Sequence, residues 1–125
     1  MFGFFVTVAH LLMGGAFVAF GVRNLKNIPR LTATLEAKKI SQPENAAKFG
    51  VGLQMAGGAM TFLGAFVGFF GLLGGLAMRV FLVLATVLYH PFWEFSGDER
   101  EQHLGPVLTN LALFGGFLLV FAWHL

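Results

Sequence analysis

Apolar residues fill four long stretches of the chain, and polar residues gather in the connections between them. A helix needs about 20 mostly apolar residues to cross the roughly 30 Å hydrocarbon core of a bilayer. Runs of that length predict four transmembrane helices, at about residues 2–22, 46–69, 75–93 and 106–124. The pattern therefore predicts an all-α fold in which residues 1–125 form one domain, an integral membrane four-helix bundle.

The turn between the second and third spans is predicted at Gly71–Gly75, because glycine tolerates the backbone conformations of tight connections. Pairs of small residues, such as Gly64 with Gly68 and Gly14 with Gly21, predict faces where helices approach closely. The first span lacks a basic segment before it and an obvious cleavage site. We therefore expect a retained helix there, whereas a cleaved signal peptide would leave three helices.

The polar connection between the first two spans predicts a short interfacial helix at Arg30–Ile40, with its apolar side toward lipid. Ser41 and Glu44 have the spacing of a capping box, with Pro43 in the first turn of the helix that follows. The second polar connection is predicted to end near Gly105–Pro106, where the last span begins. Both connections are thus expected at one end of the bundle.

Composition and charge agree with a membrane protein. Hydrophobic residues make up 57% of the chain and charged residues 11%, against about 25% charged residues in soluble domains. Six of the eight Lys and Arg lie between Arg23 and Lys48, so the net charge of +2 indicates a cluster beside the membrane rather than nucleic-acid binding. Basic connections face the cytoplasm, which predicts that both termini lie outside it.

The residue content limits the chemistry. The chain has no cysteine, which excludes a disulfide, an iron-sulfur cluster and covalently attached haem. It also has no serine nucleophile motif, no phosphate-binding glycine loop and no carboxylate pair within the spans. No catalytic residue and no metal site are predicted, so any redox chemistry needs a cofactor that another molecule supplies.

The informative residues are polar side chains at membrane depth, because each is costly there unless it has a partner or faces a cavity. Gln54, His90, Trp93 and Asn110 are expected to converge at the cytoplasmic end of the bundle. They could offer hydrogen bonds and an aromatic wall to a quinone ring that enters from the lipid. They also fit an aromatic belt, a helix stop and interhelical hydrogen bonds, and composition alone favours that second interpretation.

Two further polar residues stand apart from this group. His10, near the middle of the first span, could hydrogen-bond a quinone carbonyl, ligate a haem or chlorin metal, or relay a proton. A single interhelical hydrogen bond explains it equally well. Arg79 is expected near the start of the third span, from where its side chain can reach the membrane surface. His124 is expected at that same surface.

The chain resembles the DoxX family of small four-helix membrane proteins. The resemblance rests mainly on Ala85–Trp93, with its His-x-Phe-Trp pattern, and on Asn110–Gly116, with Asn-Leu-Ala-x-x-Gly-Gly. The end of the first span, Gly21–Leu25, and the connection with Pro29 are also similar, so the resemblance covers nearly the whole chain. The family often has Glu where this sequence has Gln54, and an Arg near the start of the first helix, which this chain lacks.

The resemblance implies a role in a redox membrane system, since related proteins include the membrane subunit of an archaeal thiosulfate:quinone oxidoreductase. It places His90, Trp93, Asn110, Gln54 and Arg79 at motif positions. A bacterial or archaeal cytoplasmic membrane is the expected location, with the lipid bilayer and other proteins as partners and quinone as ligand. An accessory subunit packed on a respiratory or photosynthetic complex is the alternative, and a small-solute transporter fits the sequence less well.

Overall fold

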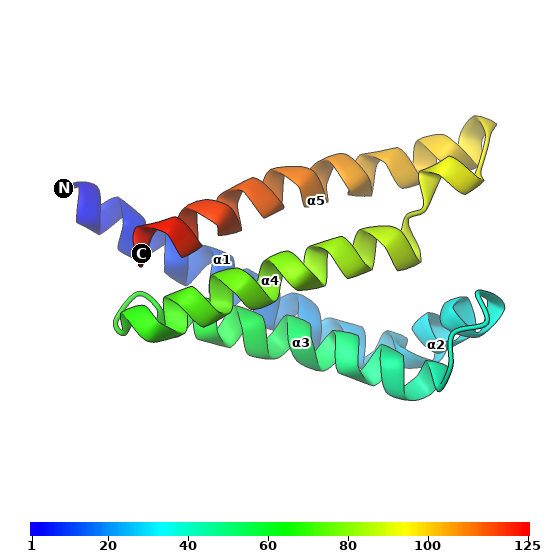
Figure 1. The fold of residues 1–125 in the computed structure, drawn as a ribbon, viewed down its shortest axis with the longest axis horizontal. Helices are drawn as coiled ribbons and strands as arrows, with labels where there is room; N and C mark the ends of the chain where they lie inside the picture. The colour runs from blue at the N-terminus through cyan, green and yellow to red at the C-terminus, as the bar shows by residue number, and fades with distance from the viewer.

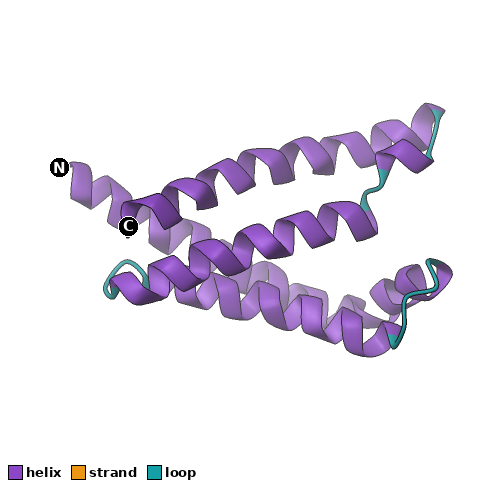
Figure 2. Ribbon diagram, viewed as in Figure 1, coloured by secondary structure: helices purple, strands orange, loops and turns teal.

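The computed structural model describes residues 1–125, and all its regular structure is helical (Figures 1 and 2). The prediction of an all-α chain is therefore confirmed. Two short 3-10 helices accompany five α-helices. The elements in chain order are α1 (Phe2–Asn24), η1 (Leu25–Asn27), α2 (Ile28–Ala37), α3 (Pro43–Leu63), α4 (Gly68–Tyr89), η2 (Phe92–Glu94) and α5 (Gly97–Trp123).

The long helices pack in the order α1, α3, α4, α5, and α2 packs on α3. Both chain termini and the α3–α4 connection lie at one end of the molecule, at the left in Figure 1. The other end holds α2 and the α4–α5 connection. We call these the terminal end and the loop end.

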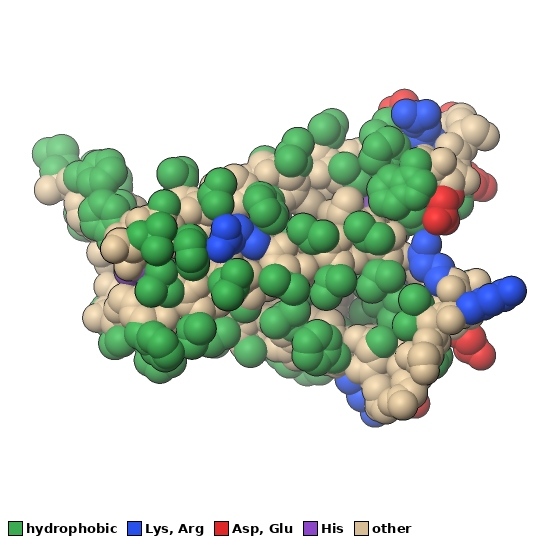
Figure 3. Space-filling model, viewed as in Figure 1, with side chains coloured by type: hydrophobic (Ala, Val, Ile, Leu, Met, Phe, Trp, Pro, Cys, Tyr) green, Lys and Arg blue, Asp and Glu red, His purple; other side chains and the backbone are tan.

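Three segments, Phe2–Ala37, Gly68–Glu94 and Gly97–Trp123, are long and apolar enough to cross a membrane. Their outer faces carry large exposed apolar side chains; Leu119 on α5, for example, is 74% exposed. Figure 3 shows apolar side chains along the flanks of the molecule, with most charges gathered at the loop end. Such a surface is stable in lipid and costly in water, so the chain is a membrane protein.

Helix α3 is not among the three apolar segments, and it packs between α1 and α4 through small residues. A Cβ atom added to Gly14 would lie 2.6 Å from the Gly58 carbonyl oxygen, and one added to Gly58 would lie 2.8 Å from the Val18 nitrogen. The α1 and α3 backbones are therefore in direct contact here. Gly14 and Gly21 both face α3, which confirms the predicted small-residue face of the first helix.

The apolar core lies between α1, α4 and α5. It consists of Phe17, Met78, Leu82, Phe117 and Val120, with the Phe17 and Phe117 rings edge to face at 5.3 Å between centroids. This geometry suits the charge distribution of aromatic rings.

The predicted turn at Gly71–Gly75 is wrong. The α3–α4 connection lies at residues 64–67, and Gly71, Gly74 and Gly75 are buried inside α4. A Cβ atom on Gly74 would lie 2.5 Å from the backbone nitrogen of Thr61, so these glycines allow close helix packing rather than a turn. As a result α3 ends at Leu63 and α4 begins at Gly68, several residues earlier than the predicted spans.

The predicted capping box of α3 and the predicted start of the last helix also need correction. Helix α3 begins at Pro43 as expected, but its N-cap is Gln42 in the left-handed conformation (φ 51°, ψ 60°), and no side chain caps it. Helix α5 begins at Gly97 and continues through Gly105–Pro106 without a break. A proline inside a helix removes one backbone hydrogen bond, and here the helix tolerates that loss.

The short helix predicted at Arg30–Ile40 exists as α2, but its apolar side does not face lipid. Leu35 is completely buried and Leu31 lines a partly open cavity between the helices. Helix α2 packs on α3, so its leucines contact protein.

Candidate functional site

A cavity of about 650 Å³ lies at the loop end, bordered by residues of α1, α2, α3, α4 and α5. Its apolar lining comes from aromatic and aliphatic side chains: Phe17, Phe20, Val51, Phe81, Leu82 and Leu113. Its polar lining comes from Asn24, Arg30, Gln54, Tyr89, His90, Thr109 and Asn110. An apolar cavity with a few converging polar groups is the usual form of a small-molecule site.

Three of the six sequence-predicted residues meet in this cavity. Gln54 comes from α3, His90 follows the last residue of α4, and Asn110 comes from α5. Residues 54 and 110 are far apart in the sequence, and only the packing of α3, α4 and α5 brings them to one space.

Hydrogen bonds fix the two amides and leave part of each free. The Asn24 side-chain amide donates to Gln54 Oε1 at 2.9 Å, and the Asn110 amide donates to Thr86 Oγ1 at 3.0 Å. No protein group pairs with the Gln54 amide N–H groups or with Asn110 Oδ1. The cavity can therefore offer a bound molecule both a hydrogen-bond donor and an acceptor.

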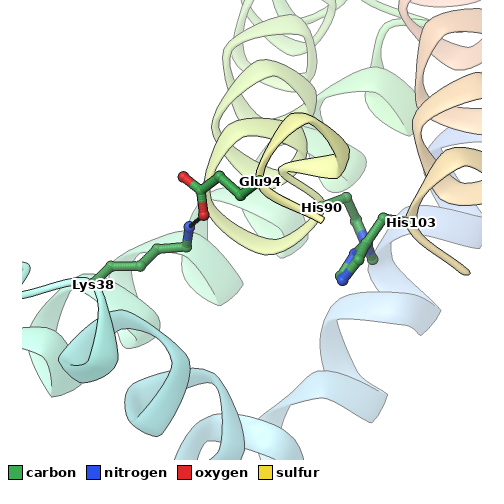
Figure 4. Close-up of polar contacts among 4 residues, drawn as sticks. All are labelled: Lys38, His90, Glu94 and His103. Atoms are coloured by element: carbon green, nitrogen blue, oxygen red, sulfur yellow. Dashed lines mark hydrogen bonds and ion pairs between the residues drawn. The ribbon is translucent and has the colours of Figure 1, made fainter. Parts of the chain in front are cut away.

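A pair of histidines stands at the cavity rim (Figure 4). The Nδ1 atoms of His90 and His103 are 3.2 Å apart, and the His103 ring stacks on Phe95 with 4.6 Å between centroids. His103 lies near the start of α5, so this contact joins that helix to the end of α4. The pairing of His103 with His90 depends on the fold of the α4–α5 connection, so the sequence pattern does not indicate it.

A single ion pair joins the residue after α2 to η2 at the same end. Lys38 Nζ lies 3.4 Å from Glu94 Oε2, and both side chains are partly exposed (Figure 4). Arg30, on α2, lines the cavity without a carboxylate partner. The cavity therefore has a cationic edge.

The other three predicted residues do not line this cavity. Trp93 is 53% exposed and its ring contacts Phe92. Arg79 lies in the middle of α4, where its guanidinium sits 4.3 Å from the centre of the Phe121 ring and its Nε donates to the Gly75 carbonyl. The prediction of Arg79 near a helix end is wrong because α4 begins earlier than expected.

His10 lies toward the terminal end and is 1% exposed. Its Nε2 atom is 2.8 Å from Nε2 of His124, so an interhelical hydrogen bond, one of the interpretations left open for His10, is present. His124 is half-buried in this contact.

Sequence reasoning did not assign five polar residues to the cavity or its rim: Asn24, Arg30, Tyr89, His103 and Thr109. Asn24 carried a usable signal, since it is a polar residue at the end of an apolar helix. Its partner Gln54 depends on how α1 crosses α3, which the sequence pattern does not give. No cluster of three or more His, Cys, Asp or Glu side chains is placed to hold a metal ion.

Fold and cavity together define an all-α membrane protein with an apolar, polar-rimmed cavity at one end. Comparison with family models, curated proteins and solved structures finds no match to the chain. The resemblance to the DoxX family therefore stays a prediction.

Proposed function

We propose that the chain is a DoxX-like membrane subunit whose cavity at the loop end binds a quinone or a closely similar lipid-soluble ring. The observation that carries the proposal is the meeting of polar side chains from α1, α3, α4 and α5 in one apolar cavity. Its volume lies within the range of about 300–1,000 Å³ that is typical of ligand sites.

The proposed membrane arrangement includes α3 as a fourth spanning helix. Its glycines and polar residues are covered by α1 and α4, so lipid contacts less of its polar surface. Helix α2 would then lie at the membrane surface. Seven of the eight Lys and Arg lie at the loop end: the six from Arg23 to Lys48, and Arg100. By the positive-inside rule, we propose that this end faces the cytoplasm and that both termini lie outside it.

The cavity groups match the two redox forms of a quinone. The free Gln54 amide N–H can donate to a ring carbonyl, and Asn110 Oδ1 can accept from a quinol hydroxyl. Phe20, Phe81 and Tyr89 line the same space and can contact the ring faces. The donor and acceptor thus serve both the oxidised and the reduced ligand.

Electrons would come from another protein. The chain has no cysteine and no cluster of metal-binding side chains, so it offers no ligands for an iron-sulfur cluster. A lipid-soluble ligand can enter sideways, because α1 and α5 do not pack backbone to backbone as α1 and α3 do. We therefore propose a soluble redox partner that docks at the loop end.

The test is quinone binding to the purified protein in lipid nanodiscs. Asn110→Leu and Gln54→Leu each replace a polar side chain with an apolar one of similar size. Each should weaken quinone binding about tenfold, the equivalent of roughly 1.4 kcal/mol. Trp93→Phe is the matched control, since Trp93 lies outside the cavity. Equal affinity in all four proteins would remove the site assignment.

The alternative function, an accessory subunit that contributes only packing, predicts a different result in native membranes. Gentle extraction followed by mass spectrometry should then yield a large complex of fixed stoichiometry with no retained quinone. A retained quinone together with a soluble redox protein supports the proposed function.

A further inference from the structure

A second pair of histidines, far from the cavity, remains without a role in the proposed function. His10 lies on α1 and His124 directly follows α5, and their rings meet nearly edge to face, with an interplanar angle of 82°. The two Nε2 atoms are 2.8 Å apart. The contact brings two nitrogen ligands together at the junction of α1, α4 and α5.

The proton positions follow from one hydrogen bond. His10 Nδ1 lies 2.7 Å from the Val6 carbonyl oxygen, and a carbonyl oxygen can only accept. His10 Nδ1 therefore carries the hydrogen, and the neutral ring has its lone pair on Nε2, where it accepts from the Nε2–H of His124. A metal ion can bind both Nε2 atoms only when the His124 hydrogen moves to Nδ1, which leaves that ring neutral. Metal-binding histidines are commonly oriented in this way, by a hydrogen bond from the nitrogen that does not bind the metal.

The surroundings favour a cation of low charge. No Asp, Glu or Cys lies with the pair to neutralise a divalent ion, and the cavity beside His10 is lined mainly by apolar side chains such as Phe5, Met13 and Val120. Burying uncompensated charge is costly, and the cost is smaller for one charge than for two. His124 also lies at the C-terminal end of α5, where the helix dipole stabilises a cation.

We propose that His10 and His124 form a two-coordinate site for a monovalent soft metal ion, copper(I). Imidazole nitrogen is a good copper ligand, and copper(I) accepts two such ligands in a line. Metal–nitrogen bonds of about 2 Å require roughly 4 Å between the two nitrogens, so the rings move about 1 Å apart when the ion enters. The His124 ring already packs against the backbone of Gly68 and Gly71, so this movement has to come from the chain end that follows α5.

The histidine pair at the cavity rim provides the matched comparison. His90 and His103 are also close, but neither ring nitrogen is bonded to a backbone carbonyl that would fix the tautomer. We expect that pair to bind copper(I) less tightly.

The test is an anaerobic titration of the purified protein with copper(I) against a coloured chelator. Wild type and His103→Gln should each hold one copper(I) per chain, whereas His10→Gln and His124→Gln should bind at least tenfold more weakly. Circular dichroism and gel filtration check that each variant folds. X-ray absorption of the wild-type complex should show two nitrogen neighbours and no sulfur.

The proposal is overturned if wild-type protein loses all copper(I) to the chelator. It is also overturned if copper(I) stays bound in both His10→Gln and His124→Gln, or if zinc(II) binds to the wild type more tightly than copper(I). None of them bears on quinone binding, because the two sites share no residue.

Discussion

The same long helices pack differently at the two ends of the bundle. Toward the terminal end, glycines bring backbones into contact, as where Gly14 meets Gly58 and Gly74 meets Thr61. At the loop end, Asn24, Gln54 and Asn110 border a cavity of about 650 Å³ instead. Small side chains therefore determine where the helices touch, and polar and aromatic side chains border the space where the helices separate.

We expect the two ends to lie on opposite sides of the membrane, which is the largest difference between them. The chain has no cysteine, so single cysteines can be introduced at exposed positions without background. We expect Phe66→Cys, in the α3–α4 connection, to react with a membrane-impermeant thiol reagent in intact cells. Glu36→Cys, on α2, should react only after the membrane is opened. The reverse labelling would contradict the proposed orientation.

Backbone contact toward the terminal end can be tested with neighbouring glycines. Gly14→Ala should lower the free energy of unfolding by about 1–3 kcal/mol, because the new methyl group meets the α3 backbone. The methyl group added in Gly15→Ala meets only the edge of the Phe62 ring, at 3.9 Å. This variant should raise the free energy of unfolding by up to about 1 kcal/mol, because alanine favours the helix more than glycine does. Unfolding in mixed detergent, followed by circular dichroism, measures both. Equal effects would argue against a close-packed seam.

At the loop end, a larger side chain in the cavity should weaken ligand binding without destabilising the fold. Ala85→Phe fills part of the cavity and should weaken quinone binding at least tenfold, with the free energy of unfolding changed by less than about 1 kcal/mol. Val80→Phe, on the lipid-facing side of the same helix, should bind quinone as the wild type does. A large loss of stability in Ala85→Phe would show that the cavity is tightly packed.

The smallest expected effect concerns the link across the loop end. Lys38→Ala removes the ion pair with Glu94, and exposed pairs of this kind contribute about 0–1 kcal/mol. The difference from wild type should disappear at high salt, where exposed charges are screened. Lys26→Ala, which removes a charge without an ion pair, is the control. A loss above 2 kcal/mol would mean that this contact holds the end together.

The sequence predicts the all-α fold because apolar run length is a direct consequence of crossing a membrane. It misplaces the α3–α4 turn because glycine serves both turns and close helix contacts, and only packing distinguishes the two uses of Gly71 and Gly74. The same error put Arg79 near a helix end rather than in the middle of α4.

The candidate site could be predicted in part. His90, Gln54 and Asn110 stand out as polar residues in apolar segments, and the structure brings them together. Trp93 is on the same connection but turns outward, and Asn24 and His103 join through contacts between distant segments. Such pairings depend on helix crossing and loop conformation, which periodicity does not encode.

Quinone binding in the loop-end cavity can be measured directly by photo-crosslinking with an azido-quinone, followed by mass spectrometry of the labelled peptides. We expect label on cavity residues of α4 and α5, around Phe81–Tyr89 and Thr109–Leu113, and loss of that label when unreactive quinone is added in excess. Label spread over lipid-facing residues such as Phe69 and Leu119, unchanged by competitor, would contradict it.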